Sequence, residues 1–67
     1  MIPHFELTSG RCVNGTVLFG THLMLDIEGL DNEQQLELLA VVEDAAWTFV
    51  TSTRDGSCWL LRKRGTL

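Results

Sequence analysis

One stretch of the chain, from Leu30 to Trp47, repeats its apolar residues with the 3.6-residue period of an α-helix. In the segments on either side, apolar and polar residues alternate, and β-branched residues and turn signals are frequent, which predicts strands. The apolar stripe of the predicted helix contains Leu38, Leu39, Val42, Ala45, Ala46 and Phe49, and the opposite face carries Glu33, Glu37 and Asp44. A helix with one apolar face needs another layer to cover it, so we expect a helix packed on a sheet.

The sequence also marks the two ends of this helix. Asp31 is a good N-cap, and Gln34 three residues later completes a capping box, so we expect the helix to begin near Asn32. Aromatic and β-branched residues follow Ala46 and favour a strand. We therefore expect the helix to end near Ala46 or Trp47.

Two dipeptides of Asn or Asp followed by Gly predict hairpin turns, because these residues accept the positive φ angles of a type I′ turn. Asn14-Gly15 predicts a hairpin between residues 11–13 and 16–18, and the strand that leaves it extends to Glu28 with a bend at Gly20. Asp55-Gly56 predicts a second hairpin, between residues 47–53 and 58–63.

In the N-terminal segment, residues 5–13, apolar and polar residues alternate as in a half-buried strand, but Ser9-Gly10 interrupts this pattern. This interruption is either a bulge or a tight turn, and a turn would add one short strand.

These elements predict an α+β fold, an antiparallel sheet of about four strands with one helix packed on one face, in the order β-β-α-β-β. With 67 residues the chain forms a single small domain, residues 1–67. The last strand is apolar on both sides, because Trp59 and Leu61 share one parity and Cys58 and Leu60 the other. An apolar face left uncovered is a candidate binding surface or dimer surface.

Neither a membrane span nor a signal peptide is visible, so we expect a complete cytoplasmic protein. Cys12 and Cys58 have no CxxC spacing, and we expect both to be reduced, buried, small hydrophobic residues. His4, Cys12, His22 and Cys58 are of the right kinds for zinc but lack ligand spacing, so we expect no metal. No nucleophile elbow, phosphate loop or HExxH motif occurs, which predicts a non-enzymatic protein without a cofactor.

Charge is segregated along the chain, whose formal net charge is −4. Seven of the nine acids lie between Asp26 and Asp44 with no Lys or Arg among them, whereas Arg62, Lys63 and Arg64 are consecutive. One interpretation of the acidic segment is a solvated helix face. The other is a surface that engages a basic partner and speeds its capture by electrostatic steering.

The second interpretation leads to the main functional hypothesis, an interaction protein that binds and inhibits or modulates a larger protein or nucleoprotein complex. A phage-encoded inhibitor of host nucleic-acid machinery, of the anti-CRISPR kind, is one form of it. The predicted partner-binding residues are Asp26, Glu28, Glu33, Glu37 and Asp44 for charge, with Trp59 as an apolar anchor. A homodimer through the doubly apolar last hairpin is a further hypothesis.

The alternative is a small nucleic-acid-binding protein that uses Arg11, Arg62, Lys63 and Arg64. Residues 10–17, GRCVNGTV, resemble the G-R-x-V-x-G-x-L stretch of the first Sm motif, and Arg64-Gly65 resembles the Arg-Gly of the second. This resemblance covers eight residues plus two and implies RNA binding by a β-rich fold. The chain departs from the Sm pattern because the Asp and Asn of the RNA-binding loop have no counterpart beside residues 21–25, and because a helix is predicted where Sm proteins have strands.

Overall fold

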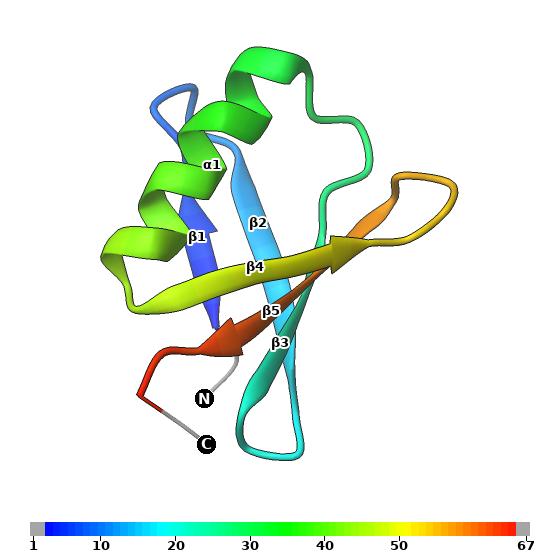
Figure 1. The fold of residues 1–67 in the computed structure, drawn as a ribbon. Helices are drawn as coiled ribbons and strands as arrows, with labels where there is room; N and C mark the ends of the chain where they lie inside the picture. The colour runs from blue at the N-terminus through cyan, green and yellow to red at the C-terminus, as the bar shows by residue number, and fades with distance from the viewer. Residues whose placement is uncertain (1–2, 66–67) are drawn as a thin grey trace.

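The chain folds into one antiparallel sheet of five strands with a single helix on one face (Figure 1). The computed structural model describes residues 3–65. The elements are β1 (His4–Glu6), β2 (Cys12–Leu18), β3 (His22–Asp26), α1 (Asn32–Asp44), β4 (Trp47–Ser52) and β5 (Cys58–Lys63). Their order in the sheet is β1-β2-β3-β5-β4, so β1 and β4 form its edges.

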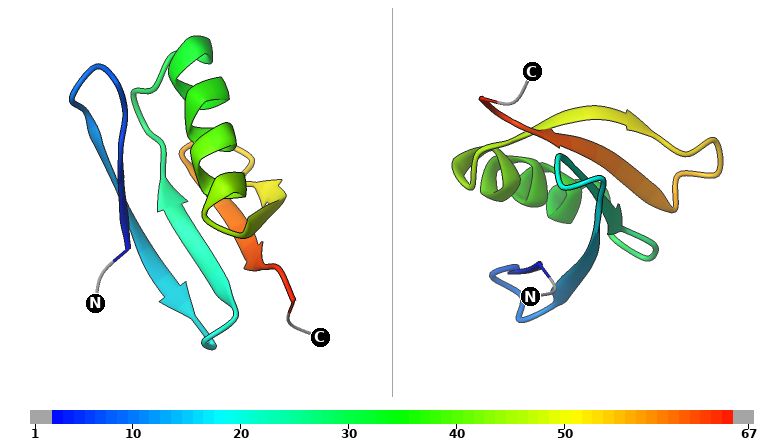
Figure 2. Two further views of the ribbon diagram at one scale, coloured as in Figure 1. Left: turned by 90° about the vertical axis from the view of Figure 1, so that its left-hand side faces the viewer. Right: turned by 90° about the horizontal axis from the view of Figure 1, so that it is seen from below.

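This architecture confirms the predicted α+β class and corrects its details. The sheet has five strands where about four were expected, and the order along the chain is β-β-β-α-β-β. The helix joins β3 to the edge strand β4, and both views in Figure 2 show it against one side of the strands. The short strand β1 accounts for the difference in number, because Ser9-Gly10 lies in a turn: Gly10 donates to the Leu7 carbonyl at 2.8 Å.

The predicted turn at Asn14-Gly15 is wrong. Both residues lie inside β2, where Asn14 pairs with His4 of β1 and Gly15 pairs with Leu25 of β3. A Cβ atom on Gly15 would lie 2.7 Å from Leu23 Cδ1 and 2.8 Å from Leu25 Cδ2. Glycine at this position therefore makes room for two core leucines.

The chain reverses instead at Phe19-Gly20, within the segment predicted as one long strand. Both residues have positive φ, 56° and 71°, and Thr21 donates to the Leu18 carbonyl at 3.2 Å. Two successive positive φ values are the signature of a type I′ hairpin turn. Phenylalanine rarely adopts a positive φ, so the sequence indicated only a bend at Gly20 and not a hairpin turn.

The start of the helix is confirmed and its end comes earlier than predicted. Asp31 Oδ1 accepts from the Gln34 backbone at 2.8 Å, and Gln34 Oε1 accepts from the Asp31 backbone at 3.1 Å, which is the expected capping box. The helix ends at Asp44, and Ala46 turns the chain with a φ of 75°. The predicted hairpin at Asp55-Gly56 is confirmed, since β4 and β5 pair across it.

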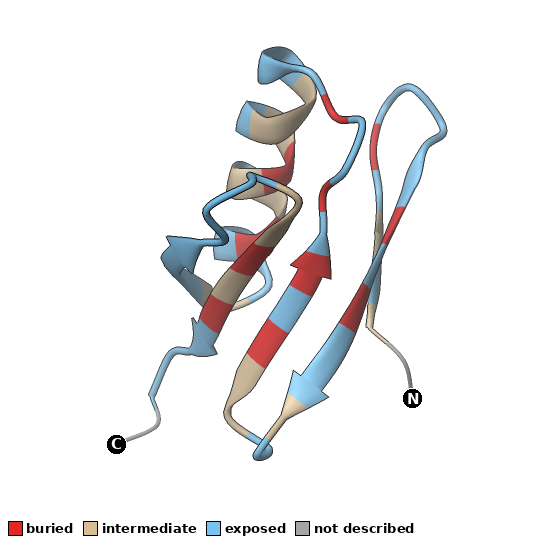
Figure 3. Cartoon of the chain, turned by 90° about the vertical axis from the view of Figure 1, so that its right-hand side faces the viewer, coloured by how far each residue is buried: buried red, intermediate tan, exposed pale blue. Residues whose placement is uncertain are grey.

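The core lies between α1 and the inner face of the sheet, and in Figure 3 buried and exposed residues alternate along the strands. The helix contributes Leu38 and Val42, fully buried, while Leu39 is half-buried and Ala45 is exposed at the C-cap. The other buried hydrophobic residues are Leu7, Val13, Leu23, Leu25, Ile27, Leu30, Trp59 and Leu61.

The two cysteines do not lie in this core, contrary to expectation. Cys12 is exposed and Cys58 is half-buried, and both thiols are free. Each occupies a strand position whose side chain faces away from α1, because its neighbours Val13 and Trp59 point into the core.

Candidate interaction surfaces

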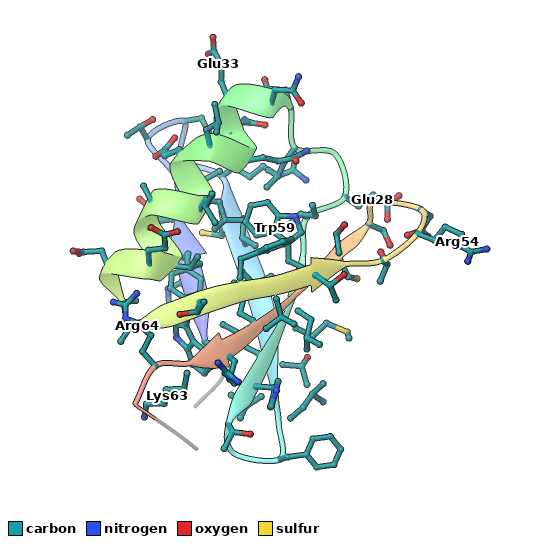
Figure 4. All side chains as sticks on the ribbon, in the orientation of Figure 1. Glu28, Glu33, Arg54, Trp59, Lys63 and Arg64 are labelled. Atoms are coloured by element: carbon teal, nitrogen blue, oxygen red, sulfur yellow. The ribbon has the colours of Figure 1, made fainter. Side chains whose placement is uncertain are left out.

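The predicted acidic residues of the helix extend over its whole length. Glu33 lies in the first turn and Asp44 is the last helical residue, so about 16 Å of helix separates them. Spacings of four and eleven residues put Glu33, Glu37 and Asp44 on one side of α1. Glu33 and Asp44 are exposed. Figure 4 shows Glu33 projecting from the N-terminal end of the helix.

Glu37 has a structural contact that the other two acids lack. Its Oε2 accepts from the Thr8 backbone at 2.7 Å, and its Oε1 accepts from Thr8 Oγ1 at 3.0 Å. Both carboxylate oxygens are therefore engaged with the loop between β1 and β2, and the side chain is half-buried. This carboxylate ties the helix to the N-terminal hairpin.

Asp26 and Glu28 lie apart from the helix side. Asp26 is the last residue of β3 and points away from α1, because its strand neighbour Leu25 is buried beneath the helix. Glu28 lies on the connection between β3 and α1, away from Glu33 in Figure 4. The expected joint acidic surface of strand edge and helix is thus divided between two faces of the protein.

An open groove runs beside the helix on the side of β5. It has a volume of about 400 Å³ and is lined by Asn32, Gln35, Leu36, Leu39 and Trp59. Leu36 is 69% exposed, although it belongs to a helix. Leu36 lies outside the predicted apolar stripe, so the sequence already indicated that this large apolar side chain does not pack in the core. This was the one sequence signal for the groove.

Trp59, predicted as an apolar anchor, is largely buried and lines this groove. The side chain is 7% exposed, and its ring packs edge-to-face on Phe49 with centroids 5.4 Å apart. Figure 4 shows the ring between α1 and β4. The indole N–H has no hydrogen-bond partner within residues 3–65, and every fully buried polar side-chain atom there has one, so this N–H reaches solvent. The groove is the opening that Trp59 lines.

Helix acids border this groove. Glu33 precedes Leu36 by three residues and Glu43 follows it by seven, so both lie close to the Leu36 side of the helix. Glu43 is exposed and was not among the predicted site residues. The groove therefore combines apolar walls, a free N–H donor and an acidic rim.

The four basic residues of the alternative hypothesis do not form one patch. Arg11 donates to the carbonyls of Glu28 at 2.6 Å and Gly29 at 3.0 Å, beyond the last residue of β3. Arg62 pairs with His22, the first residue of β3, and so lies at the other end of this strand. Arg64 donates to the Glu43 carbonyl at 2.5 Å, where it caps the helix C-terminus.

A second apolar hollow lies on the face of the sheet opposite the helix. Its volume is about 290 Å³, and it is lined by Leu18, Phe19, His22, Met24 and Leu60. Phe19 is 93% exposed at the tip of the hairpin that joins β2 and β3. This hollow lies on the apolar sheet surface that the sequence led us to expect.

Within residues 3–65, no three His, Cys, Asp or Glu side chains gather in a way that could hold a metal ion. The same part of the chain contains no helix long and apolar enough to cross a membrane.

No protein-family model matches the chain, and neither a curated protein nor a solved structure matches it significantly. Functional inference therefore rests on the surfaces described above.

Proposed function

We propose that this protein is a non-enzymatic interaction protein that binds a larger macromolecule through the groove between α1 and β5 and the adjacent acidic side of the helix. The observation that supports this proposal best is the exposed Leu36 beside the partner-free N–H of Trp59. An exposed leucine next to an apolar groove enlarges the groove into a contiguous apolar patch, and such patches mark interaction sites.

The chemistry of the groove indicates the kind of partner. Leu36 and Leu39 would receive an apolar side chain, and the Trp59 N–H would donate to a carbonyl oxygen. Glu33 and Glu43 would attract basic residues of the same segment. A short basic amphipathic segment of a larger protein fits these features, and its binding should weaken as salt rises.

Inhibition or modulation of that protein is the biological consequence that we propose, including the case of a phage-encoded inhibitor of host nucleic-acid machinery. We further propose that it acts in the cytoplasm, where the free thiols of Cys12 and Cys58 stay reduced.

Site-specific photocrosslinking tests the groove. A photoreactive phenylalanine derivative at position 36 should capture the partner in producing cells, whereas the same probe at Arg54, exposed in the hairpin after β4, should not. Glu33→Lys together with Glu43→Lys should abolish the adduct at position 36. Glu37 is left intact because it holds Thr8. An adduct that forms equally well after charge reversal, or no adduct at position 36, would contradict the proposal.

Nucleic-acid binding is the weaker proposal, supported by the exposed Arg62, which pairs across the strands with His22 of the second hollow. Measuring the affinity of the protein for labelled RNA and DNA at several salt concentrations tests this proposal, because phosphate contacts make affinity strongly salt-dependent. Absence of binding at low salt removes it.

A further inference from the structure

The face of the sheet opposite the helix, here called the outer face, has a regular arrangement of side chains. Along β3 and β5 every second residue points away from α1. The strand register aligns these residues into rows that run across the two strands. The rows are His22 with Arg62, Met24 with Leu60, and Asp26 with Cys58.

The centre of the outer face is apolar. Met24 and Leu60 form its middle row, and the hollow of about 290 Å³ that they share with Leu18 and Phe19 adjoins this row. None of the described elements covers this face, since α1 packs on the other side of the sheet.

The two charges of these rows lie at opposite ends and have opposite signs. Asp26 and Arg62 are four residues apart along the strand direction, or roughly 13 Å. The Arg62 guanidinium has no hydrogen-bond or ion-pair partner among residues 3–65. Asp26 uses one oxygen, Oδ1, to accept from the Glu28 backbone at 3.1 Å, which leaves Oδ2 free.

We propose that the outer face binds a second copy of this chain, face to face. The twofold axis lies in the plane of the interface and runs along the row of Met24 and Leu60. This axis exchanges the two ends of the face, so Arg62 of each copy meets Asp26 of the other. Met24 and Leu60 of one copy then pack against the same two residues of the other at the axis. Such a surface is complementary to itself, as a twofold interface requires.

Charge distinguishes this surface from the rest of the protein. The chain has a formal net charge of −4, so two copies repel each other at the acidic helix side. In the rows of β3 and β5 one acid and one arginine balance, and Glu6, the further acid on the outer face, lies on the edge strand β1. A second copy therefore meets less electrostatic repulsion at these rows than at the acidic helix side.

The area of the face sets the expected strength. Four strands of about five residues measure roughly 19 by 17 Å, or about 320 Å² per copy, which is less than a standard specific interface buries. We therefore expect a weak dimer that forms at micromolar or higher concentrations. In this dimer the helix-side grooves of the two copies face outward in opposite directions, so the dimer would present two of them.

Sedimentation equilibrium from about 10 μM to about 1 mM tests the dimer directly. The wild-type protein should change from monomer to dimer over this range. Arg62→Asp and Asp26→Arg should each raise the dissociation constant about tenfold or more, because each places like charges opposite one another. An equimolar mixture of the two variants should form a heterodimer, since one copy then carries two arginines and the other two aspartates.

Two further variants complete the test. Leu60→Glu should abolish dimerisation, and Leu36→Glu, in the groove on the other side of the sheet, should leave it unchanged. Amide NMR spectra verify that each variant folds. A wild-type protein that stays monomeric throughout, or single reversals that dimerise as the wild type does, would overturn the proposal. The crosslinking test of the groove depends on other residues, so its result is independent of the result for the dimer.

Discussion

Asn14-Gly15 and Asp55-Gly56 are the two places in the chain where Asn or Asp precedes Gly, and they lie in opposite environments. Asp55-Gly56 forms an exposed hairpin turn in which Gly56 has a φ of 75° and no other atom lies near its missing Cβ. Asn14-Gly15 lies in the middle of an extended strand, and Gly15 is buried against Leu23 and Leu25.

The two glycines therefore serve different purposes. Gly56 is required by its own backbone, which adopts a conformation that L-residues rarely accept. Gly15 is required by side chains of the neighbouring strand, which occupy the space of a Cβ. One is a local requirement that a dipeptide reveals, and the other is a packing requirement that appears only once strands pair.

Replacement of Gly15 should have the largest effect. Gly15→Ala places a Cβ within 2.8 Å of two fully buried leucine side chains, so we expect a loss of about 2 kcal/mol of unfolding free energy from overpacking. Urea denaturation measures it. Leu25→Val in the same chain should recover part of the loss by making room, and purely additive effects of the two substitutions would contradict the packing explanation.

Gly56→Ala should cost less, about 1 kcal/mol, because only a positive φ is disturbed and the space is open. The same denaturation experiment applies. D-alanine at position 56, introduced by chemical synthesis, favours a positive φ and should restore or exceed wild-type stability. A D-alanine variant no more stable than the L-alanine variant would show that backbone strain is not the cause.

Asp55 offers the smallest effect and one that depends on pH. Its Oδ1 accepts from the Ser57 backbone at 3.0 Å and from the hydroxyls of Thr53 and Ser57, each at 2.8 Å. These hydrogen bonds, the one from the Ser57 backbone first, lower the pKa of Asp55 below its usual value of 3.8. The unfolded chain therefore binds this proton more readily, and the ionised carboxylate stabilises the fold above the unfolded-state pKa.

That contribution should disappear as the pH falls through the folded-state pKa. Asp55→Asn should lower the melting temperature slightly at neutral pH and not at strongly acidic pH. In acid the wild-type carboxylate is protonated, so neither side chain carries a charge. Thermal unfolding of both proteins across pH 2 to 7 provides the comparison. Curves separated by a constant amount at every pH would contradict this assignment. Asn14, exposed in β2, has no comparable set of hydrogen bonds, so Asn14→Ala should change stability little at any pH.

The candidate sites were predicted in part. Acidic residues at Glu33 and Asp44 are exposed on the helix side, as their spacing indicated. The contact of Glu37 with Thr8 and the position of Asp26 on the outer face depend on segments that are far apart in sequence, so helical spacing alone did not show them. The same holds for Trp59, whose burial follows from the packing of α1 over β5.

The sequence by itself determined the elements that depend on neighbouring residues: the helix with its Asp31–Gln34 capping box, the hairpin at Asp55-Gly56, and the α+β class. Tertiary structure decided the rest, namely that Asn14-Gly15 is strand, that Phe19-Gly20 is the turn, and that the acids lie on two faces. The physical reason is the range of the interactions. Caps and tight turns are satisfied within about four residues, whereas the space available at Gly15 and the contact available to Glu37 are set by strands and loops that approach only in the folded protein.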